Sequence, residues 1–346
     1  MPRVMTAADI SAAGGALKTE LEVPVFLFIG DSNRRGSSDN EATVSYTQDS
    51  NVLALNASGV FAEYVPRTFT GLSNDANNGS VGAEMEFSRQ FRLANPSKPC
   101  YIVKYGSSGS GASKLNTGTI TGSISGSAFT VTVGSTALGD LIYGTGITTG
   151  NVYIASGAGP YTLQQGTLQT VPYFSDPDSS VNLTIASQTF SKANAYLSWK
   201  PDDGRNFYLM YRRLTQAFAN LSVQGKKPYL AGIFVSLGAN DSSDATAAGV
   251  YNGAMSSIYR SLKASPYWNS RTIFILDRVP TTGGGASVST VRSAAATFKG
   301  QYRDVRLLDC DAFSKNTADP IHYNLAGLAS VGLGEYNLWS GASAGL

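Results

Sequence analysis

The chain has 346 residues, of which only 14% are charged, and its formal net charge is +2. This length allows one large domain or two domains with a substantial core. No stretch concentrates Lys and Arg with interleaved aromatic residues, which argues against a nucleic-acid partner, and no apolar run is long enough for a membrane helix. Residues 1–23 lack the continuous apolar run of an ordinary signal peptide. We therefore expect a cytoplasmic protein, or one that reaches the outside by another route.

Five short apolar runs predict buried parallel strands, because their apolar residues are consecutive rather than alternating. They lie at residues 23–30, 99–105, 229–237, 272–278 and 304–309. Helical patterns separate them, and one helix is expected to begin near Ser80, with Glu84 and Glu86 in its first turns. A second helix is expected over 205–222, where one apolar stripe contains Phe207, Met210, Tyr211, Leu214, Phe218 and Leu221. Strands that alternate with helices indicate a doubly wound α/β sheet.

The segment 116–190 interrupts this pattern. It is rich in Gly, Ser and Thr and contains no Lys, Arg or Glu. Short runs of Val, Ile, Tyr and Leu between glycine-bearing turns favour a small β module over disorder. We therefore expect 1–115 and 191–346 to form one α/β domain, into which 116–190 is inserted as an all-β module.

The single histidine, His322, is a candidate for acid–base chemistry. Asp319 precedes it by three residues and could accept a hydrogen bond from one ring nitrogen, leaving the other to take a proton from a nucleophile. A histidine packed under a loop is the alternative. One histidine cannot build a His-rich metal site, and Cys100 and Cys310 adjoin apolar runs, which is typical of buried thiols rather than a disulfide.

Further polar residues follow the predicted strands. Ser32 comes directly after the first strand, where it is either part of a surface turn or a nucleophile presented at the sheet edge. Asn240 follows a strand that ends at Leu237, and ligands of open α/β sheets bind at that edge. Its amide could donate to a developing oxyanion, although an Asx turn is equally compatible with the segment. Gly79 and Gly82 precede a helix, where a backbone N–H can point at an anion, although both also fit as ordinary loop glycines.

Together these segments resemble the four ordered blocks of the SGNH (GDSL-type) hydrolases, over roughly 23–115 and 192–332. The matching segments are Gly30-Asp31-Ser32-Asn33, the glycine near 82, Gly238-Ala239-Asn240-Asp241 and Asp319-Pro320-Ile321-His322. The resemblance implies a flavodoxin-like, doubly wound parallel sheet of five strands. It implies Ser32 as nucleophile, His322 as general base and Asp319 as the residue that orients it.

The same resemblance implies an oxyanion hole and a substrate class. The hole would consist of the backbone N–H of Ser32, that of Gly82 or Gly79, and the Asn240 side chain, with no cofactor and no metal. The segments "VGAEMEF", "VKYGSSGSGASKL" and "YLSWKPDDG" resemble the sialate O-acetylesterase and acetylxylan esterase branch. That branch usually has Gln in place of Asp31 and Gln-Gly-Glu-x-Asp in place of "LGAND".

The branch implies an esterase that removes O-acetyl groups from a carbohydrate. Trp199, Arg34 and the insertion at 116–190, as a carbohydrate-binding module, are the candidate sugar contacts, although Trp199 is equally compatible with packing in the core. The insertion, through "GDLIYGTGITTG" and "GPYTLQQ", resembles small β modules of bacteriophage tail and tailspike proteins. It would imply a virion-associated, extracellular protein that acts on capsule or O-antigen, with tail-assembly partners or a homo-oligomer. Two alternatives remain, a non-catalytic glycan-binding or structural module on the same fold, and a lipase or thioesterase of the same family.

Overall fold

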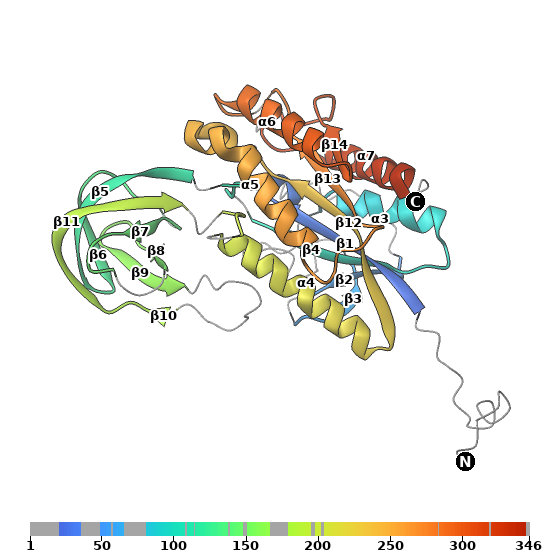
Figure 1. The fold of residues 1–346 in the computed structure, drawn as a ribbon, viewed down its shortest axis with the longest axis horizontal. Coiled ribbons are helices and arrows are strands. Elements are labelled where there is room, and N and C mark those ends of the chain that lie inside the picture. The colour runs from blue at the N-terminus through green and yellow to red at the C-terminus, as the bar shows by residue number, and fades with distance from the viewer. Residues whose placement is uncertain are drawn as a thin grey trace, which may run out of the picture.

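The structure of the protein is a computed structural model with two sheets, in which one part of the chain forms the second sheet and the parts before and after it form the main sheet (Figure 1). It describes residues 21–35, 49–56, 58–65, 81–107, 109–113, 115–137, 139–147, 151–166, 179–194, 198–201, 204–282, 284–317 and 320–343.

The main sheet has seven strands among the described residues, in the order β14-β13-β12-β1-β4-β2-β3. Their bounds are β1 (Leu21–Gly30), β2 (Val52–Leu55), β3 (Phe61–Glu63), β4 (Cys100–Gly106), β12 (Lys226–Ser236), β13 (Ile273–Arg278) and β14 (Val305–Asp309). Only β2 and β3 pair antiparallel. The five expected strands are β1, β4, β12, β13 and β14, and their order is that of a flavodoxin-like sheet. The expected number is wrong, because β2 and β3 extend the sheet beside β4.

Helices cover both faces of this sheet. They are α2 (Ser32–Arg35), α3 (Glu84–Ala94), α4 (Arg205–Val223), η1 (Asp241–Ser243), α5 (Ala245–Lys263), α6 (Val288–Gln301) and α7 (Leu325–Ser343). Leu27 and Ile29 of β1 pack in the core that α4, α5 and α6 cover, whereas Phe26 and Phe28 pack against α3 and α7. Burial on both faces explains why the strand is apolar at consecutive positions. Among the described helices, none combines the length and apolar character needed to cross a bilayer.

Two of the expected helices can be compared with the observed ones in detail. The expected helix near Ser80 begins at Glu84, so Glu84 and Glu86 do lie in its first turn. In α4 the apolar stripe is buried except at Phe218, which is only partly covered. Cys100 and Cys310 are both buried, free thiols.

The second sheet is antiparallel and lies in the chain between β4 and α4. Its strands are β5 (Leu115–Gly126), β6 (Ala128–Val133), β7 (Leu141–Tyr143), β8 (Asn151–Ser156), β9 (Tyr161–Gly166), β10 (Ser179–Ser180) and β11 (Leu183–Asn194). The order is β10-β9-β6-β5-β11-β7-β8, and β8 also pairs with β9, so all strands except β10 close into a barrel. Closure leaves these strands without a free edge and encloses an apolar core that includes Phe129, Leu163 and Phe190.

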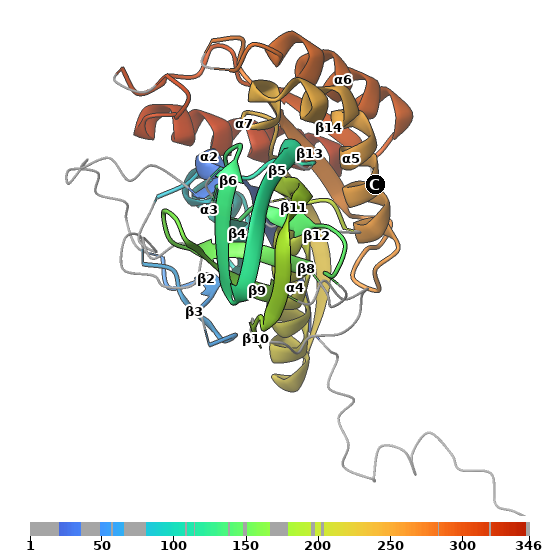
Figure 2. The same cartoon turned by 90° about the vertical axis from the view of Figure 1, so that its left-hand side faces the viewer.

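The barrel stands at the end of the main sheet where β1 and β4 finish. Gly30 and Gly106, the last residues of these strands, are paired, and the chain enters the barrel soon after Gly106. Figure 1 shows the barrel beyond this end of the sheet, and Figure 2 looks onto it from that side. The barrel and Ser32 therefore lie at the same end of the main sheet.

Candidate active site

Ser32 is placed by the close approach of two strands. A Cβ atom on Gly30 would lie 2.2 Å from the backbone oxygen of Ser236 in β12, so only glycine fits at the end of β1. The next residue, Asp31, donates its N–H to that same oxygen at 2.9 Å. The chain then turns out of the sheet, and Ser32 begins the short helix α2 as a half-buried residue. Its hydroxyl is thereby presented at the carboxyl edge of the sheet, where α/β proteins bind ligands.

The structure brings Ser32 and His322 together across 290 residues of sequence. The Nε2 atom of His322 lies 2.6 Å from Oγ of Ser32, within the range expected for a nucleophile and its base. His322 lies in the segment between β14 and α7, and Asn316 donates its N–H to the His322 carbonyl at 2.9 Å. Asp319 lies outside the described residues, so its role in orienting the imidazole stays a prediction.

Asn33 holds the backbone on both sides of His322. Its Nδ2 donates to the carbonyl of Ile321, and its Oδ1 accepts from the N–H of Tyr323, both at 3.2 Å. The side chain that follows the nucleophile thus fixes the segment that carries the base. Sequence reasoning gave Asn33 no role, because both partners lie almost 300 residues away and no local pattern marks them.

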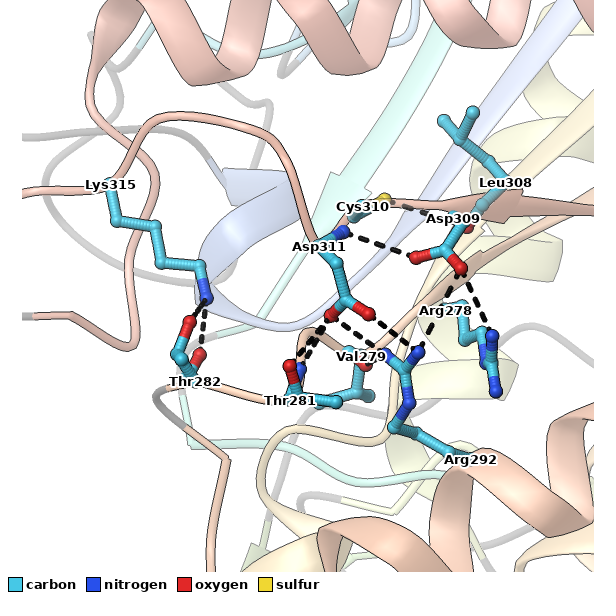
Figure 3. A network of polar contacts seen from close by, with 10 residues as sticks. All are labelled: Arg278, Val279, Thr281, Thr282, Arg292, Leu308, Asp309, Cys310, Asp311 and Lys315. Carbon is cyan, nitrogen blue, oxygen red and sulfur yellow. Dashed lines mark hydrogen bonds and ion pairs between the residues drawn. The ribbon is translucent and has the colours of Figure 1, made fainter.

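A second set of contacts holds the segment that leads to His322 (Figure 3). Asp311 accepts hydrogen bonds from the N–H and Oγ1 of Thr281, at 2.7 and 3.1 Å. It also forms a two-pronged pair with Arg292 of α6, at 3.0 and 2.7 Å. Lys315 donates to Oγ1 of Thr282 at 2.8 Å. These contacts join the β14–α7 segment to the β13–α6 loop, at the rim of the site.

The predicted oxyanion donors are placed differently from one another. Asn240 is half-buried and donates one amide hydrogen to the carbonyl of Ser110 at 2.9 Å, which leaves its second amide hydrogen for a ligand. Gly82 is buried, and a Cβ there would lie 2.7 Å from Nζ of Lys104, which pairs with Glu84 at 2.6 Å. A side chain at position 82 would therefore press on this ion pair, which explains why a glycine stands there. The role of Gly82 as an oxyanion donor stays a prediction, and Gly79 lies outside the described residues.

Asp241 shapes the glycine-rich turn that follows β4. Its buried carboxylate accepts from the N–H groups of Ala112 and Ser113, at 2.9 and 3.1 Å. Burial raises the pKa of Asp241 to about 6, although these hydrogen bonds favour the ionised form. Asp241 thus holds the glycine-rich turn in place. The same turn contains Ser110, whose carbonyl accepts the hydrogen bond from the Asn240 amide.

Both predicted sugar contacts require correction. Trp199 is fully buried, and its Nε1 donates to Oγ of Ser110 at 2.9 Å, so it packs behind the glycine-rich turn. Arg34 is 1% exposed and forms ion pairs with Asp277 of β13, at 2.8 Å, and with Glu335 of α7. Neither side chain reaches the surface where a sugar would bind.

The Arg34 cluster places two carboxylates around one guanidinium. Glu335 accepts from both terminal nitrogens of Arg34, whereas Asp277 accepts from one, and Oδ1 of Asp277 has no hydrogen-bond partner among the described residues. Burial, together with the negative charge of Glu335, raises the pKa of Asp277 well above its ordinary value. Both effects favour the neutral form of the Asp277 carboxyl. The cluster ties the nucleophile helix α2 to β13 and to α7, the helix that follows His322.

Asp31, the residue before Ser32, lies in surroundings that favour its neutral form. It is 1% exposed, and burial raises its pKa to about 7, against the opposing hydrogen bond from the N–H of Asn33. A carboxyl with this pKa is largely neutral in mildly acidic solution. A cavity of about 10 Å³ lies beside it, lined by Asp31, Asp277 and Thr282 among others.

Comparisons with known proteins support the fold. No protein-family model matches the chain, and no curated protein matches it significantly. A solved structure of a protein from Arabidopsis thaliana superposes with a TM-score of 0.58 at 13% identity, over 93% of this chain and 98% of that one. At this identity the likeness shows a shared fold and carries no shared activity.

Two further solved structures are more distant. NanS superposes with a TM-score of 0.49 at 10% identity, over 93% of this chain and 97% of that chain. A carbohydrate acetylesterase family member from Sinorhizobium meliloti gives 0.42 at 8% identity, over 93% and 99% of the two chains. Likenesses this weak add nothing to the functional assignment, which must come from the site itself.

Proposed function

We propose that the protein is a serine esterase that removes O-acetyl groups from a carbohydrate. The observation that carries this proposal is the 2.6 Å contact between Oγ of Ser32 and Nε2 of His322 at the carboxyl edge of the parallel sheet. A hydroxyl this close to an imidazole can lose its proton to it as it attacks a carbonyl. Asn240, with one amide hydrogen left, is the described side chain that supports an oxyanion hole at this edge.

The mechanism follows from these positions. His322 accepts the Ser32 proton while Oγ bonds to the acetyl carbon, and the carbonyl oxygen becomes an oxyanion. His322 then gives the proton to the departing sugar oxygen, which leaves an acetyl group on Ser32. Water, deprotonated by His322, attacks this ester, and acetate leaves as Ser32 recovers its proton. In this proposal Asp319 stabilises the imidazolium, and the N–H groups of Ser32 and Gly82 complete the oxyanion hole.

The acyl group is assigned as acetyl from the sequence. The segments around Glu84, Lys104 and Trp199 resemble the carbohydrate acetylesterase branch. This resemblance favours a short acyl group over the lipase or thioesterase alternative.

The test is ester hydrolysis by wild type and Ser32→Ala. Wild type should release nitrophenol from nitrophenyl acetate and acetate from acetylated xylan or O-acetylated sialic acid. Ser32→Ala should lower kcat by about 10³-fold or more, because the nucleophile is gone. Ser293→Ala, an exposed serine in α6, serves as the matched control and should keep full activity. Full activity of Ser32→Ala, or a preference for octanoate over acetate, contradicts the proposal.

The finer assignment concerns the biological substrate. Deacetylation of capsule or O-antigen by a phage tail protein rests on the resemblance of 116–190 to tail modules, and it stays a prediction. A panel of acetylated polysaccharides, with acetate release measured for each, tests it. Binding of a glycan with no acetate release from any of them would instead favour the non-catalytic module.

A further inference from the structure

A second cleft lies at the end of the main sheet opposite Ser32. Its volume is about 590 Å³, within the usual range for ligand sites. Its walls come from the first residues of β1 and β12, the end of α4 and the segment that precedes β13. Glu22 is near the start of β1 and Ser32 follows its end, and ten residues of strand span about 33 Å. The cleft is therefore separate from the candidate active site.

Aromatic side chains form part of the cleft wall. Phe218 belongs to the apolar stripe of α4, yet it is only partly covered and lines the cleft. Its ring centroid is 4.5 Å from that of Tyr267, whose hydroxyl is held by Oγ1 of Thr215 at 2.9 Å. Trp268 also lines the cleft, with its ring edge-on to Tyr259 at 5.4 Å. These rings are fixed by packing and keep surface exposed, which suits a ligand with apolar C–H faces.

The charged residues of the cleft carry an excess of positive charge. Glu22 accepts from Arg271 at 3.0 Å and pairs with Lys227 at 3.6 Å, so two cations share one carboxylate. The Arg271 guanidinium lies over the Tyr229 ring, 3.9 Å from its centroid, which holds it in place. Arg271 and Lys227 are 47% and 61% exposed, so both can bind a second carboxylate. Asn269 and Ser270 add polar groups beside them.

We propose that this cleft binds an acidic saccharide unit of a polysaccharide. The sugar's C–H face packs on the exposed aromatic surface, its carboxylate pairs with Arg271 and Lys227, and its hydroxyls meet the amide and hydroxyl groups at the rim. That the ligand is a saccharide rests on the proposed function, whereas the carboxylate follows from the charges of the cleft. A nucleic-acid strand needs several phosphate contacts, and a net charge of one unit does not supply them.

The experiment measures binding of the full chain carrying Ser32→Ala, so that hydrolysis plays no part. The probes are oligosaccharides of polygalacturonate, alginate and polysialic acid, with dextran oligosaccharides as neutral sugars and a single-stranded oligonucleotide as a second anion. We expect at least one acidic oligosaccharide to bind more tightly than dextran in isothermal titration calorimetry. Adding Arg271→Gln should weaken that binding about tenfold or more, because a charge-assisted hydrogen bond is lost. Trp268→Ala should weaken it too.

The matched control is Arg303→Gln, which removes one exposed cation outside the cleft and should leave affinity within about twofold. Equal weakening by Arg303→Gln and Arg271→Gln, no binding of any acidic oligosaccharide, or tighter binding of the oligonucleotide overturns the inference. Thermal melting checks that each variant folds. Because Arg271 is exposed, Arg271→Gln still tests the inference if Trp268→Ala fails to fold. Hydrolysis of nitrophenyl acetate is measured in parallel on wild type and on Arg271→Gln, which should be equal. Binding without hydrolysis contradicts the proposed function alone, and hydrolysis without binding contradicts this inference alone.

Discussion

Two polar networks hold the candidate active site, and they differ in burial. The buried ion cluster consists of Arg34, Asp277 and Glu335, each at most 5% exposed. The rim network is the set in Figure 3 around Asp311 and Arg292, in which Asp311 is 37% exposed and its partner Arg292 is 9% exposed. Both fix an element that carries a catalytic candidate, α2 in one case and the His322 segment in the other.

The difference in burial decides how much each network contributes to the stability of the fold. Water cannot replace a lost partner inside the cluster, so an unpaired charge there costs several kcal/mol. At the rim, water and salt screen the charges, and a single pair contributes little. The contrast predicts that variants of the cluster change folding stability, whereas variants of the rim network change it only slightly.

The largest effect is expected from Arg34→Met. This change leaves the Glu335 carboxylate, beside the Asp277 carboxyl, buried without a cation, and we expect the free energy of unfolding to fall by about 3–5 kcal/mol. Urea denaturation followed by circular dichroism measures it, with the exposed Arg303→Met as control. A loss below about 1 kcal/mol would mean that the cluster is no more important than a surface pair.

The next effect separates the two carboxylates of the cluster. If Asp277 carries the proton, Asp277→Asn replaces one neutral group by another and should change stability by less than about 1 kcal/mol at pH 7. Glu335→Gln removes the charge that pairs with Arg34 and should cost about 3 kcal/mol. The same denaturation experiment compares them. The reverse order would place the proton on Glu335.

A pH-dependent effect is expected from Asp31, which shares a small cavity with Asp277 of the cluster and Thr282 of the rim. Its pKa is about 7 in the folded protein and 3.8 as an ordinary carboxyl. Between these values the folded state binds more protons than the unfolded state, so the carboxyl lowers stability as pH rises from about 4 to about 7. Asp31→Asn should therefore be more stable than wild type at pH 8, and this gain should shrink to nothing near pH 4. Melting temperatures across this range measure it, and a pH-independent difference would show that Asp31 is ionised throughout.

The smallest effect is expected from Asp311→Asn. Burial alone would raise the pKa of Asp311, but the Thr281 hydrogen bonds and Arg292 hold it below the ordinary value. The carboxylate therefore stabilises the fold above pH 4, and this contribution is lost as pH falls through its depressed pKa. Because the group is exposed, we expect a loss of less than about 1 kcal/mol at pH 7 that shrinks in 1 M salt. A larger or salt-independent loss would contradict the contrast between the networks.

Much of the framework could be predicted from sequence because its signal is local. Consecutive apolar residues such as Phe26 to Ile29 are typical of a strand covered on both faces, and this pattern placed the five parallel strands within three residues of their observed bounds. The carboxyl ends of parallel strands meet at one edge, which explains why Ser32 and Asn240 were found as candidates. The strands β2 and β3 were missed because four and three residues are too short to show a period.

The side chains around the site depended on contacts that no local pattern contains. Arg34 was expected at the surface as a sugar contact, but its partners lie 243 and 301 residues away in sequence and draw it inside. Trp199 and Asn33 likewise took their positions from Ser110 and from the backbone on either side of His322. Phe218 fits the buried stripe of its helix and nevertheless lines a cleft. Sequence by itself determined the strands and the edge where chemistry is possible, because periodicity and chain direction are local properties. Only the tertiary structure decided which polar side chains are buried, because burying a charge requires a partner from elsewhere in the chain.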